Sequence, residues 1–358
     1  MATLVSPRTN QLSSGRLPRI APWGILLACW AVMAVVFGLL MMGGSTAGFD
    51  AVGAIFWGTV LYVAAIWGIS RLVEGHRQAT DRLVTALVVT AFIVALLPLV
   101  SLVATVLGSG LARFDPTFFS WTMRSVVGEG GGAVHAVWGT LLMTLAATVI
   151  SVPIGLLTAI YLVEYGRGHI ARAITFLVDV MTGIPSIVAG LFAYALFAIF
   201  FGPGVRLGIA GAVALSVLMI PVVVRASEEL LRLVPNELRE ASLALGVPKW
   251  LTIVKVVLPT SVAGLTTGVM LAIARVIGET APLLIVAGFT QSLNTNLFEG
   301  RMQSLPVFVY TSYAYPGVDT QAYIDRAWAG ALTLILIVMV LNLAARLIAR
   351  FFAPKTGR

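Results

Sequence analysis

Arg275 and Glu279 are the charged residues with the clearest chemical potential, because they interrupt an otherwise apolar segment. No charged residue stands between positions 256 and 274. Their spacing of four predicts that both side chains share one face of a helix and form an ion pair. A charge at the centre of a membrane costs about 2.5–3.5 kcal/mol, so it usually faces a protein interior and has a partner. The arginine offers an anion a planar fork of donors, and a purely structural pair is the open alternative.

The preceding segment, residues 226–259, is amphipathic and is the second candidate for function. Ser227, followed by two glutamates, predicts the start of a short helix that Pro235 ends. Asn236 can cap the next helix, which we expect to stop before Gly246 because glycine favours a helix end.

The expected helix at 236–246 has a narrow apolar face, formed by Leu238, Ala241 and Leu245 at i, i+3 and i+7. So short a helix is marginal in water unless it docks on something. Two interpretations stay open from the pattern alone: an element on the membrane surface, or a docking helix for a partner.

A third feature is the sequence GIPSIVAG at 183–190, which follows Asp179 inside an apolar run. Glycine and proline within a span free backbone groups that neighbours or a cavity must satisfy. The stretch therefore predicts a kink beside a transport pathway, with close helix packing as the alternative.

Patterns for catalysis, metal binding or nucleotide binding are missing from the sequence. The three histidines have no metal-ligand spacing, no serine lies in a GxSxG motif, and no Walker A motif occurs. We expect no catalytic, cofactor-binding or metal-binding residue in this chain. If ATP drives the protein, a partner subunit must bind the ATP and its Mg²⁺.

The composition is that of a membrane protein, with 59% hydrophobic and 11% charged residues in 358. The net charge of +8 comes from basic residues scattered singly around apolar runs, so we expect lipid contacts and no nucleic acid. Cys29 lies alone in such a run, which excludes a disulfide framework. The first run, 21–42, exceeds a signal-peptide core of about 7–15 residues and is predicted to be a permanent span.

Eight apolar segments approach the roughly 20 residues that cross a bilayer. They are 21–42, 51–70, 84–107, 137–162, 175–201, 207–224, 260–282 and 327–349. With the N-terminus inside, 17 of the 23 Lys and Arg residues fall in cytoplasmic segments, as the positive-inside rule requires. Both termini are therefore predicted to be cytoplasmic, and Arg275 falls in the outer half of the bilayer.

The remaining segments complete this all-α, polytopic arrangement. We expect residues 108–136 and 283–326 to be external, the first as a glycine-rich flexible loop or shallow re-entrant piece. The first two spans form an uncharged hairpin within 21–70, which we interpret as an accessory element, with binding of a partner as the alternative.

The sequence EASLALGVPKWLTIVKVVLP resembles the EAA loop of ABC-importer permeases. That motif reads EAA, three residues, Gly, nine residues, then Ile, any residue, Leu-Pro. The matching positions are Glu240, Ala241, Gly246, Leu258 and Pro259, while Ser242 replaces the second Ala and Val256 replaces Ile. The resemblance implies a MetI-like permease core and assigns ATPase docking to Glu240, Ala241, Ser242, Leu245 and Gly246.

More narrowly, AIARVIGETAPLL with GIPSIVAG, RASEELLRLVP, SLPVFVY and AWAGALTLIL is similar to the A-type permease subunit of phosphate-specific ABC importers. The likeness covers about 84–352, so we divide the chain into an accessory unit at 1–83 and a permease domain at 84–358. It implies that Arg275 and Glu279 line the transport pathway. Arg225 matches another family arginine, either an inner-gate contact or an interfacial anchor.

This resemblance implies a permease subunit, and not an enzyme, of an ATP-driven phosphate importer in the bacterial cytoplasmic membrane. The implied partners are a C-type permease in a heterodimer, a cytoplasmic ATPase dimer and a periplasmic phosphate-binding protein. The alternatives are a permease for another oxyanion or polar solute and an ion-coupled secondary transporter that uses Arg275, Glu279 and Asp179. A membrane enzyme ranks last, since the sequence lacks a nucleophile or metal cluster.

Overall fold

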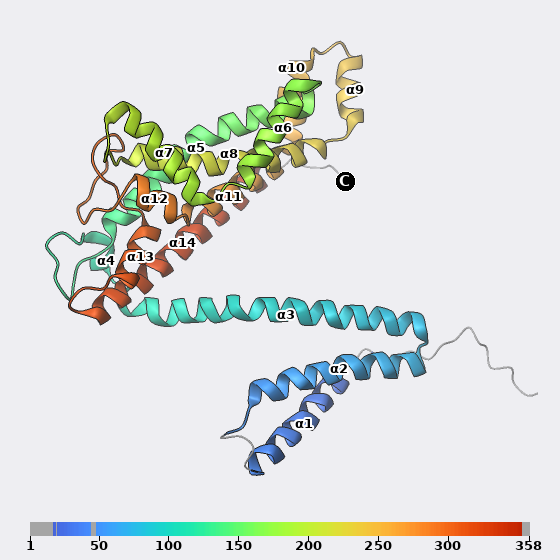
Figure 1. The fold of residues 1–358 in the computed structure, drawn as a ribbon. Helices are drawn as coiled ribbons and strands as arrows, with labels where there is room; N and C mark the ends of the chain where they lie inside the picture. Colours follow the sequence, from blue (N-terminus) through green and yellow to red (C-terminus); the bar gives the residue numbers. More distant parts are fainter. Residues whose placement is uncertain (1–16, 19, 44–47, 353–358) are drawn as a thin grey trace, which may run out of the picture. The chain divides into compact units, whose positions relative to one another are not determined.

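A computed structural model describes residues 17–18, 20–43 and 48–352, and within these ranges the regular structure is entirely helical. The chain divides into two compact units, Met1–Val103 and Ala104–Arg358. The helices of Figure 1 are α1 (Ala21–Met42), α2 (Ala51–Val73), α3 (His76–Gly110), η1 (Leu111–Arg113), α4 (Pro116–Ser120), α5 (Val134–Ile160), η2 (Tyr161–Tyr165), α6 (His169–Thr182), α7 (Ser186–Phe201), α8 (Gly208–Arg232), α9 (Asn236–Ala244), α10 (Lys249–Thr252), η3 (Ile253–Val257), α11 (Leu258–Ile277), α12 (Ala281–Val286), α13 (Leu305–Ala314) and α14 (Thr320–Phe352). The boundary predicted at residue 83 stays a prediction.

Seven of the described helical segments are long and apolar enough to cross a membrane, or eight if the bent pair α6 and α7 counts as one span. The two helices of that pair meet at 109°. The break falls at Gly183–Pro185, because proline cannot continue the preceding helix and glycine carries no side chain there. The predicted kink is thus confirmed, whereas its place beside a pathway stays a prediction.

In the N-terminal unit, α1 and α2 form an antiparallel hairpin (Figure 1). The helices approach closely at Gly58, where an added Cβ would lie 2.6 Å from the Trp30 ring. The indole nitrogen of Trp30 donates a hydrogen bond of 3.1 Å to the Thr59 hydroxyl. A small residue opposite a large one allows this packing in a hydrophobic solvent. Cys29 is buried in the same contact.

The turn between α2 and α3 is held by the buried carboxylate of Glu74. Arg82 donates to both of its oxygens, at 2.5 and 2.8 Å, while the Ser70 hydroxyl and the Leu17 backbone N–H donate at 2.7 and 2.8 Å. These donors, with Arg82 foremost, lower the pKa of Glu74 to about 2. The ionised carboxylate therefore stabilises this corner at neutral pH.

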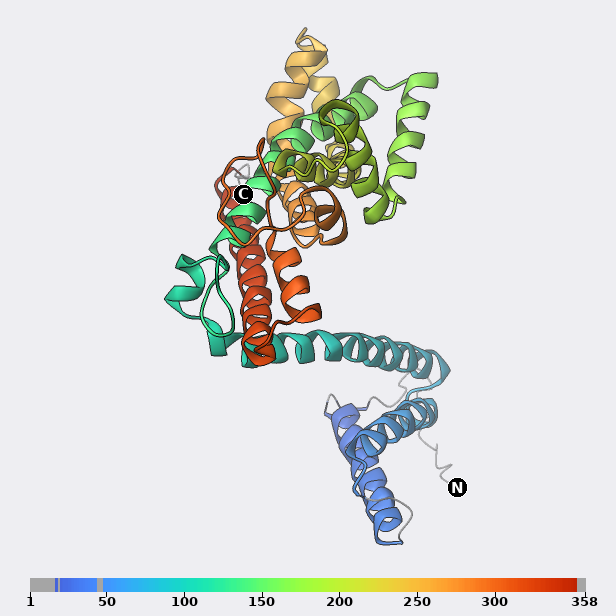
Figure 2. The same cartoon turned by 60° about the vertical axis from the view of Figure 1, so that its left-hand side comes forward.

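The C-terminal unit, Ala104–Arg358, is built around α8, the most buried candidate span, with 61% of its apolar window inside the protein. Helices α5, α7, α11 and α12 pack on it. Small residues permit the close approach: an added Cβ at Gly155 of α5 would lie 2.7 Å from Val223 of α8. Figures 1 and 2 show α9 and α10 at one end of this unit, and α4 and α13 toward the other.

One predicted helix start is wrong. The helix expected to start at Ser227 does not exist as a separate element, because α8 continues to Arg232 and buries Ser227 in its interior. Burial along one face outweighs the local preference of serine for a helix start. Helix α14 begins at Thr320, seven residues before the predicted span, so Arg326 lies within a helix.

Arg326 is fully buried, and it fastens the glycine-rich loop that precedes α5. Its Nη1 donates to the carbonyl oxygens of Gly128 and Gly130, at 2.8 and 2.7 Å. Its guanidinium also lies 4.4 Å from the centre of the Tyr323 ring, a cation–π contact. The loop predicted to be flexible is therefore attached to α14.

Candidate functional site

Helix α9 lies between two prolines, as the sequence predicted, but its start differs from the prediction. Pro235 occupies the N-cap position, and no side chain caps the helix. Asn236 is instead the first helical residue, and its side-chain oxygen accepts from Arg239 at 3.2 Å. The chain leaves the helix through Gly246 with a φ of +77°, a conformation that glycine adopts without strain.

Arg239 connects α9 to the ends of two long helices. Its Nε donates to the carboxylate of Glu164 in η2, at 3.0 Å, and its two Nη atoms donate to the carbonyls of Val234 and Leu231, at 2.5 and 2.9 Å. These carbonyls lie just beyond and within the last turn of α8, where helices leave acceptors unsatisfied. The exposed fractions of the Arg239 and Glu164 side chains are 16% and 7%, so the pair is shielded from water.

A second contact fixes α9 to α10: the hydroxyls of Ser242 and Thr252 are hydrogen-bonded at 2.9 Å. Ser242 thus faces inward, and it is buried. The apolar side chains predicted for docking, Leu238, Ala241 and Leu245, are exposed, with Leu245 at 84%. Glu240 and Gly246 are exposed as well. The helix is therefore held by its polar side and presents an uncovered apolar face.

π-helical turns stand on both sides of this region, η2 at the end of α5 and η3 before α11. A π-turn widens the helix by one residue and is often found at functional sites. Here η2 carries Glu164, and η3 packs against α9. Both turns therefore contact the element that the resemblance assigns to docking.

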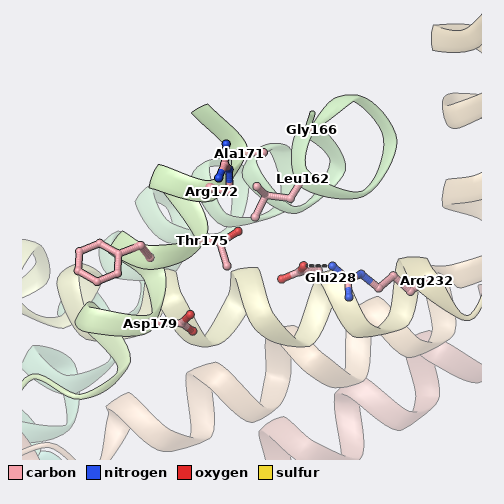
Figure 3. Close-up of a pocket in the computed structure, with 9 residues that line it drawn as sticks. Leu162, Gly166, Ala171, Arg172, Thr175, Asp179, Glu228 and Arg232 are labelled. Carbon is pink, nitrogen blue, oxygen red and sulfur yellow. Dashed lines mark hydrogen bonds and ion pairs between the residues drawn. The ribbon is translucent and has the colours of Figure 1, made fainter. Parts of the chain in front are cut away.

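Arg225 forms a charge network on the C-terminal half of α8. It makes ion pairs with Asp179 of α6 and with Glu228, the latter at 2.8 Å, and Glu228 also accepts from Arg232 at 2.5 Å. Figure 3 shows Asp179, Glu228 and Arg232 around a cavity of about 380 Å³ between α6 and α8. Arg225 therefore links the first half of the bent pair to α8.

Arg275 and Glu279 do not share a helical face, contrary to the prediction. Helix α11 ends at Ile277, and Glu279 lies beyond Gly278 in the connection to α12. The two side chains form no ion pair with each other or with another described residue. Pro282 has no backbone N–H, and in a continuous helix its ring would clash with the carbonyl of Gly278, so α11 cannot run unbroken into α12.

The Arg275 side chain is left exposed in the last turn of α11, where the helix dipole favours a cation. Apart from Arg225 on α8, the structure thus places the predicted residues in two groups at opposite ends of α11, a helix of 20 residues or about 30 Å. One group comprises α9 with η3, and the other comprises Arg275 with Glu279.

The sequence interpretation missed Glu164, Arg239 and Thr252. No spacing rule links Glu164 to Arg239, which lie 75 positions apart. An arginine in the first turn of α9 was a weak signal, because the helix dipole disfavours a cation there without a partner. Within the part of the chain that the structure describes, no three His, Cys, Asp or Glu side chains come together as metal ligands.

Comparisons with known proteins agree with this architecture. A family model described as "Binding-protein-dependent transport system inner membrane component" matches residues 151–358. The "Phosphate transport system permease protein PstA 1" of Mycobacterium tuberculosis is 48% identical over 288 residues, covering 79% of this chain and 91% of that protein. The "Phosphate transport system permease protein PstA" of Yersinia pestis is 37% identical over 286 residues, covering 79% and 93%.

Two solved structures share the fold. A chain of the inward-facing MetNI methionine ABC transporter has a TM-score of 0.51 at 23% identity, covering 62% of this chain and 95% of that one. A chain of a bacterial alginate ABC transporter has a TM-score of 0.55 at 14% identity, covering 80% and 100%. These likenesses establish a MetI-like permease fold.

Proposed function

The chain belongs to the family of binding-protein-dependent transport system inner membrane components, and we propose that it is the permease subunit of an ATP-driven importer of inorganic phosphate. The observation that carries the substrate is the 48% identity with a phosphate permease over 79% of the chain. The chain is a multi-pass membrane protein of the permease type. In this proposal, a separate subunit hydrolyses the ATP.

Helix α9 is the coupling helix in this proposal. Its apolar residues Leu238, Ala241 and Leu245 are uncovered, and a helix of nine residues needs a partner surface to bury them. A cleft on an ATPase subunit supplies that surface, with Glu240 and Gly246 at its edges. The contacts of Arg239 and Ser242 then transmit the movement of α9 to α5, α8 and α11.

Arg275 is the phosphate contact of the pathway, with Glu279 beside it. An exposed guanidinium without a carboxylate partner keeps its donors free for an anion. Glu279, beyond the helix end, moderates the positive field there. Arg225 acts farther along the path as an inner-gate contact, since its ion pair with Asp179 joins two helices that must separate for release.

The partners follow from the family. A second, C-type permease completes the pathway as a heterodimer, a dimer of ATPase subunits binds ATP and Mg²⁺ on the cytoplasmic side, and a periplasmic phosphate-binding protein delivers the substrate. The chain itself holds no cofactor. The assembly lies in the bacterial cytoplasmic membrane, with both termini of this chain inside.

Phosphate uptake by the Arg275→Glu variant tests the assignment. We expect uptake to fall by at least about tenfold, because a carboxylate repels the anion where the guanidinium bound it. Arg124→Glu, which reverses an exposed arginine in the loop before α5, is the control and should keep normal uptake. Undiminished phosphate transport by Arg275→Glu would remove the assigned role.

Competition distinguishes phosphate from another oxyanion. Excess sulfate should leave uptake of labelled phosphate unchanged, whereas arsenate, which has the shape and charge of phosphate, should inhibit it. Equal inhibition by sulfate would contradict a phosphate-specific pathway.

A further inference from the structure

A polar cavity of about 430 Å³ lies between the end of α5 and the α9–α10 pair. Four basic side chains and one carboxylate line it, together with Leu162, Val163 and Asn236. The charged lining residues are Glu164, Arg167, Arg232, Arg239 and Lys249. The lining therefore carries a surplus of positive charge, which a single carboxylate does not neutralise.

The donors of Arg239 are engaged within the protein. Its three nitrogens donate to the Glu164 carboxylate and to the carbonyls of Leu231 and Val234. Arg239 thus neutralises the one acidic residue in the cavity. Of the remaining three cations, Arg232 is paired with Glu228 outside the lining, whereas Arg167 and Lys249 have no carboxylate partner among the described residues.

Those three cations keep free donors. Arg167 is exposed and forms no hydrogen bond or ion pair with any described residue. Lys249 donates to the Glu164 backbone carbonyl and lies 4.9 Å from the Tyr165 ring centre, so it retains further N–H groups. Arg232 uses Nη2 on Glu228, and its side chain is 66% exposed.

We propose that this cavity binds a phosphate group. Two guanidinium forks and an ammonium around one space match a dianion with several acceptor oxygens better than they match a single carboxylate. The group comes either from inorganic phosphate on the inner side or from the headgroup of an anionic phospholipid. Both sources present charged non-bridging phosphate oxygens to these side chains, inorganic phosphate mostly as a dianion and the phosphodiester headgroup as a monoanion.

A phosphate group in this cavity would bridge the end of α5 and the start of α10, which adjoin the proposed coupling helix α9. Arg167 follows η2 at the end of α5, and Lys249 begins α10 directly after α9. A ligand that binds both Arg167 and Lys249 adds a second connection between these elements, besides the Arg239–Glu164 ion pair. A bound phosphate group therefore limits the movement of α9 relative to α5. The effect on coupling rests on the proposed function, whereas the binding of the phosphate group does not.

Binding to the assembled complex in nanodiscs tests the site. Every sample carries Arg275→Glu, so that phosphate near that residue does not contribute. In zwitterionic lipid, the probe is radiolabelled inorganic phosphate; in lipid containing phosphatidylglycerol, the readout is retention of that lipid by native mass spectrometry. The comparison is between the parent and the Arg167→Gln/Lys249→Gln variant, with Arg172→Gln as the matched control because Arg172 lines only the neighbouring cavity.

We expect the double variant to bind its probe at least about tenfold more weakly in one arm, as loss of two charge-assisted contacts implies, and Arg172→Gln to match the parent. The arm that responds identifies the source. Arg167→Lys/Lys249→Arg keeps both charges and should restore binding, which separates a lost ligand from a damaged fold. Equal binding by the parent and the double variant in both arms overturns the proposal. The proposal is also overturned if the double variant loses the ATPase subunit while its binding of both probes stays unchanged.

Discussion

The two ends of the C-terminal unit, Ala104–Arg358, each bury an arginine, but with different partners. At the α9 end, Arg239 meets the carboxylate of Glu164 and two carbonyls. At the opposite end, Arg326 is completely buried but binds only the carbonyls of Gly128 and Gly130, beside the Tyr323 ring. The first arrangement joins three helical elements through paired charges. The second attaches a loop to one helix.

The difference has a physical consequence. A shielded ion pair is strong only while both partners are present, since removal of one leaves the other buried and uncompensated. The guanidinium of Arg326 binds neutral carbonyls, so its removal leaves no opposite charge without a partner. Burial of this unpaired cation costs free energy, which offsets part of the stabilisation from its hydrogen bonds. The α9 end should therefore depend more sharply on its arginine than the loop end does.

The largest effect is expected for Arg239→Gln. The change leaves Glu164 buried without a partner and removes donors from two carbonyls, so it should lower the free energy of unfolding by about 3–5 kcal/mol. Chemical unfolding in detergent measures the change. Adding Glu164→Gln should recover part of the lost free energy of unfolding. A loss below about 1 kcal/mol for Arg239→Gln alone would contradict a stabilising Arg239–Glu164 ion pair.

Glu74 extends the comparison to the N-terminal unit, where a buried carboxylate depends on Arg82. Its pKa lies at about 2 in the folded protein against a usual 4.5, so its stabilisation is complete above pH 4.5 and is lost as the pH falls toward 2. The loss amounts to about 3 kcal/mol in total. Acid unfolding of wild type and Glu74→Gln should converge at low pH; a constant difference between them would contradict the lowered pKa.

Arg326→Met should have a smaller effect, about 1–2 kcal/mol, because two hydrogen bonds are lost while the burial of an unpaired charge is relieved. The same unfolding measurement applies, and proteolysis of the loop at 125–131 should quicken as it detaches from α14. A loss equal to that of Arg239→Gln would erase the distinction between the two ends.

The smallest change in stability is expected for Leu245→Asp. This side chain is 84% exposed, so the free energy of unfolding should change by less than about 0.5 kcal/mol. Co-purification of the ATPase subunit should nevertheless decline, because a charge enters the docking surface. Leu233→Asp, at an equally uncovered leucine outside α9, is the control for a general effect of charge. Normal recovery of the ATPase with Leu245→Asp would exclude docking through this face.

Several features could be predicted because they depend on local chain chemistry. Glycine and proline at 183–185 predicted a break, and Pro235 with Gly246 bounded α9, since these residues restrict or release the backbone wherever they occur. The spans followed from hydropathy. The helix start predicted at Ser227 was wrong because tertiary packing outweighed a local preference. Burial of the α8 face around Ser227 stabilises the continuous helix by more than serine favours a helix start.

The sequence by itself determined that this chain crosses a membrane several times, that a short helix interrupts the spans near 236–246, and that Arg275 stands in an apolar segment. These properties follow from composition and spacing within one stretch of chain. Only the tertiary structure decided that Arg239 pairs with Glu164, that Arg225 pairs with Asp179, and that Glu279 lies beyond the end of α11. Such contacts depend on which helices pack together, and no pattern within a single helix specifies its neighbour.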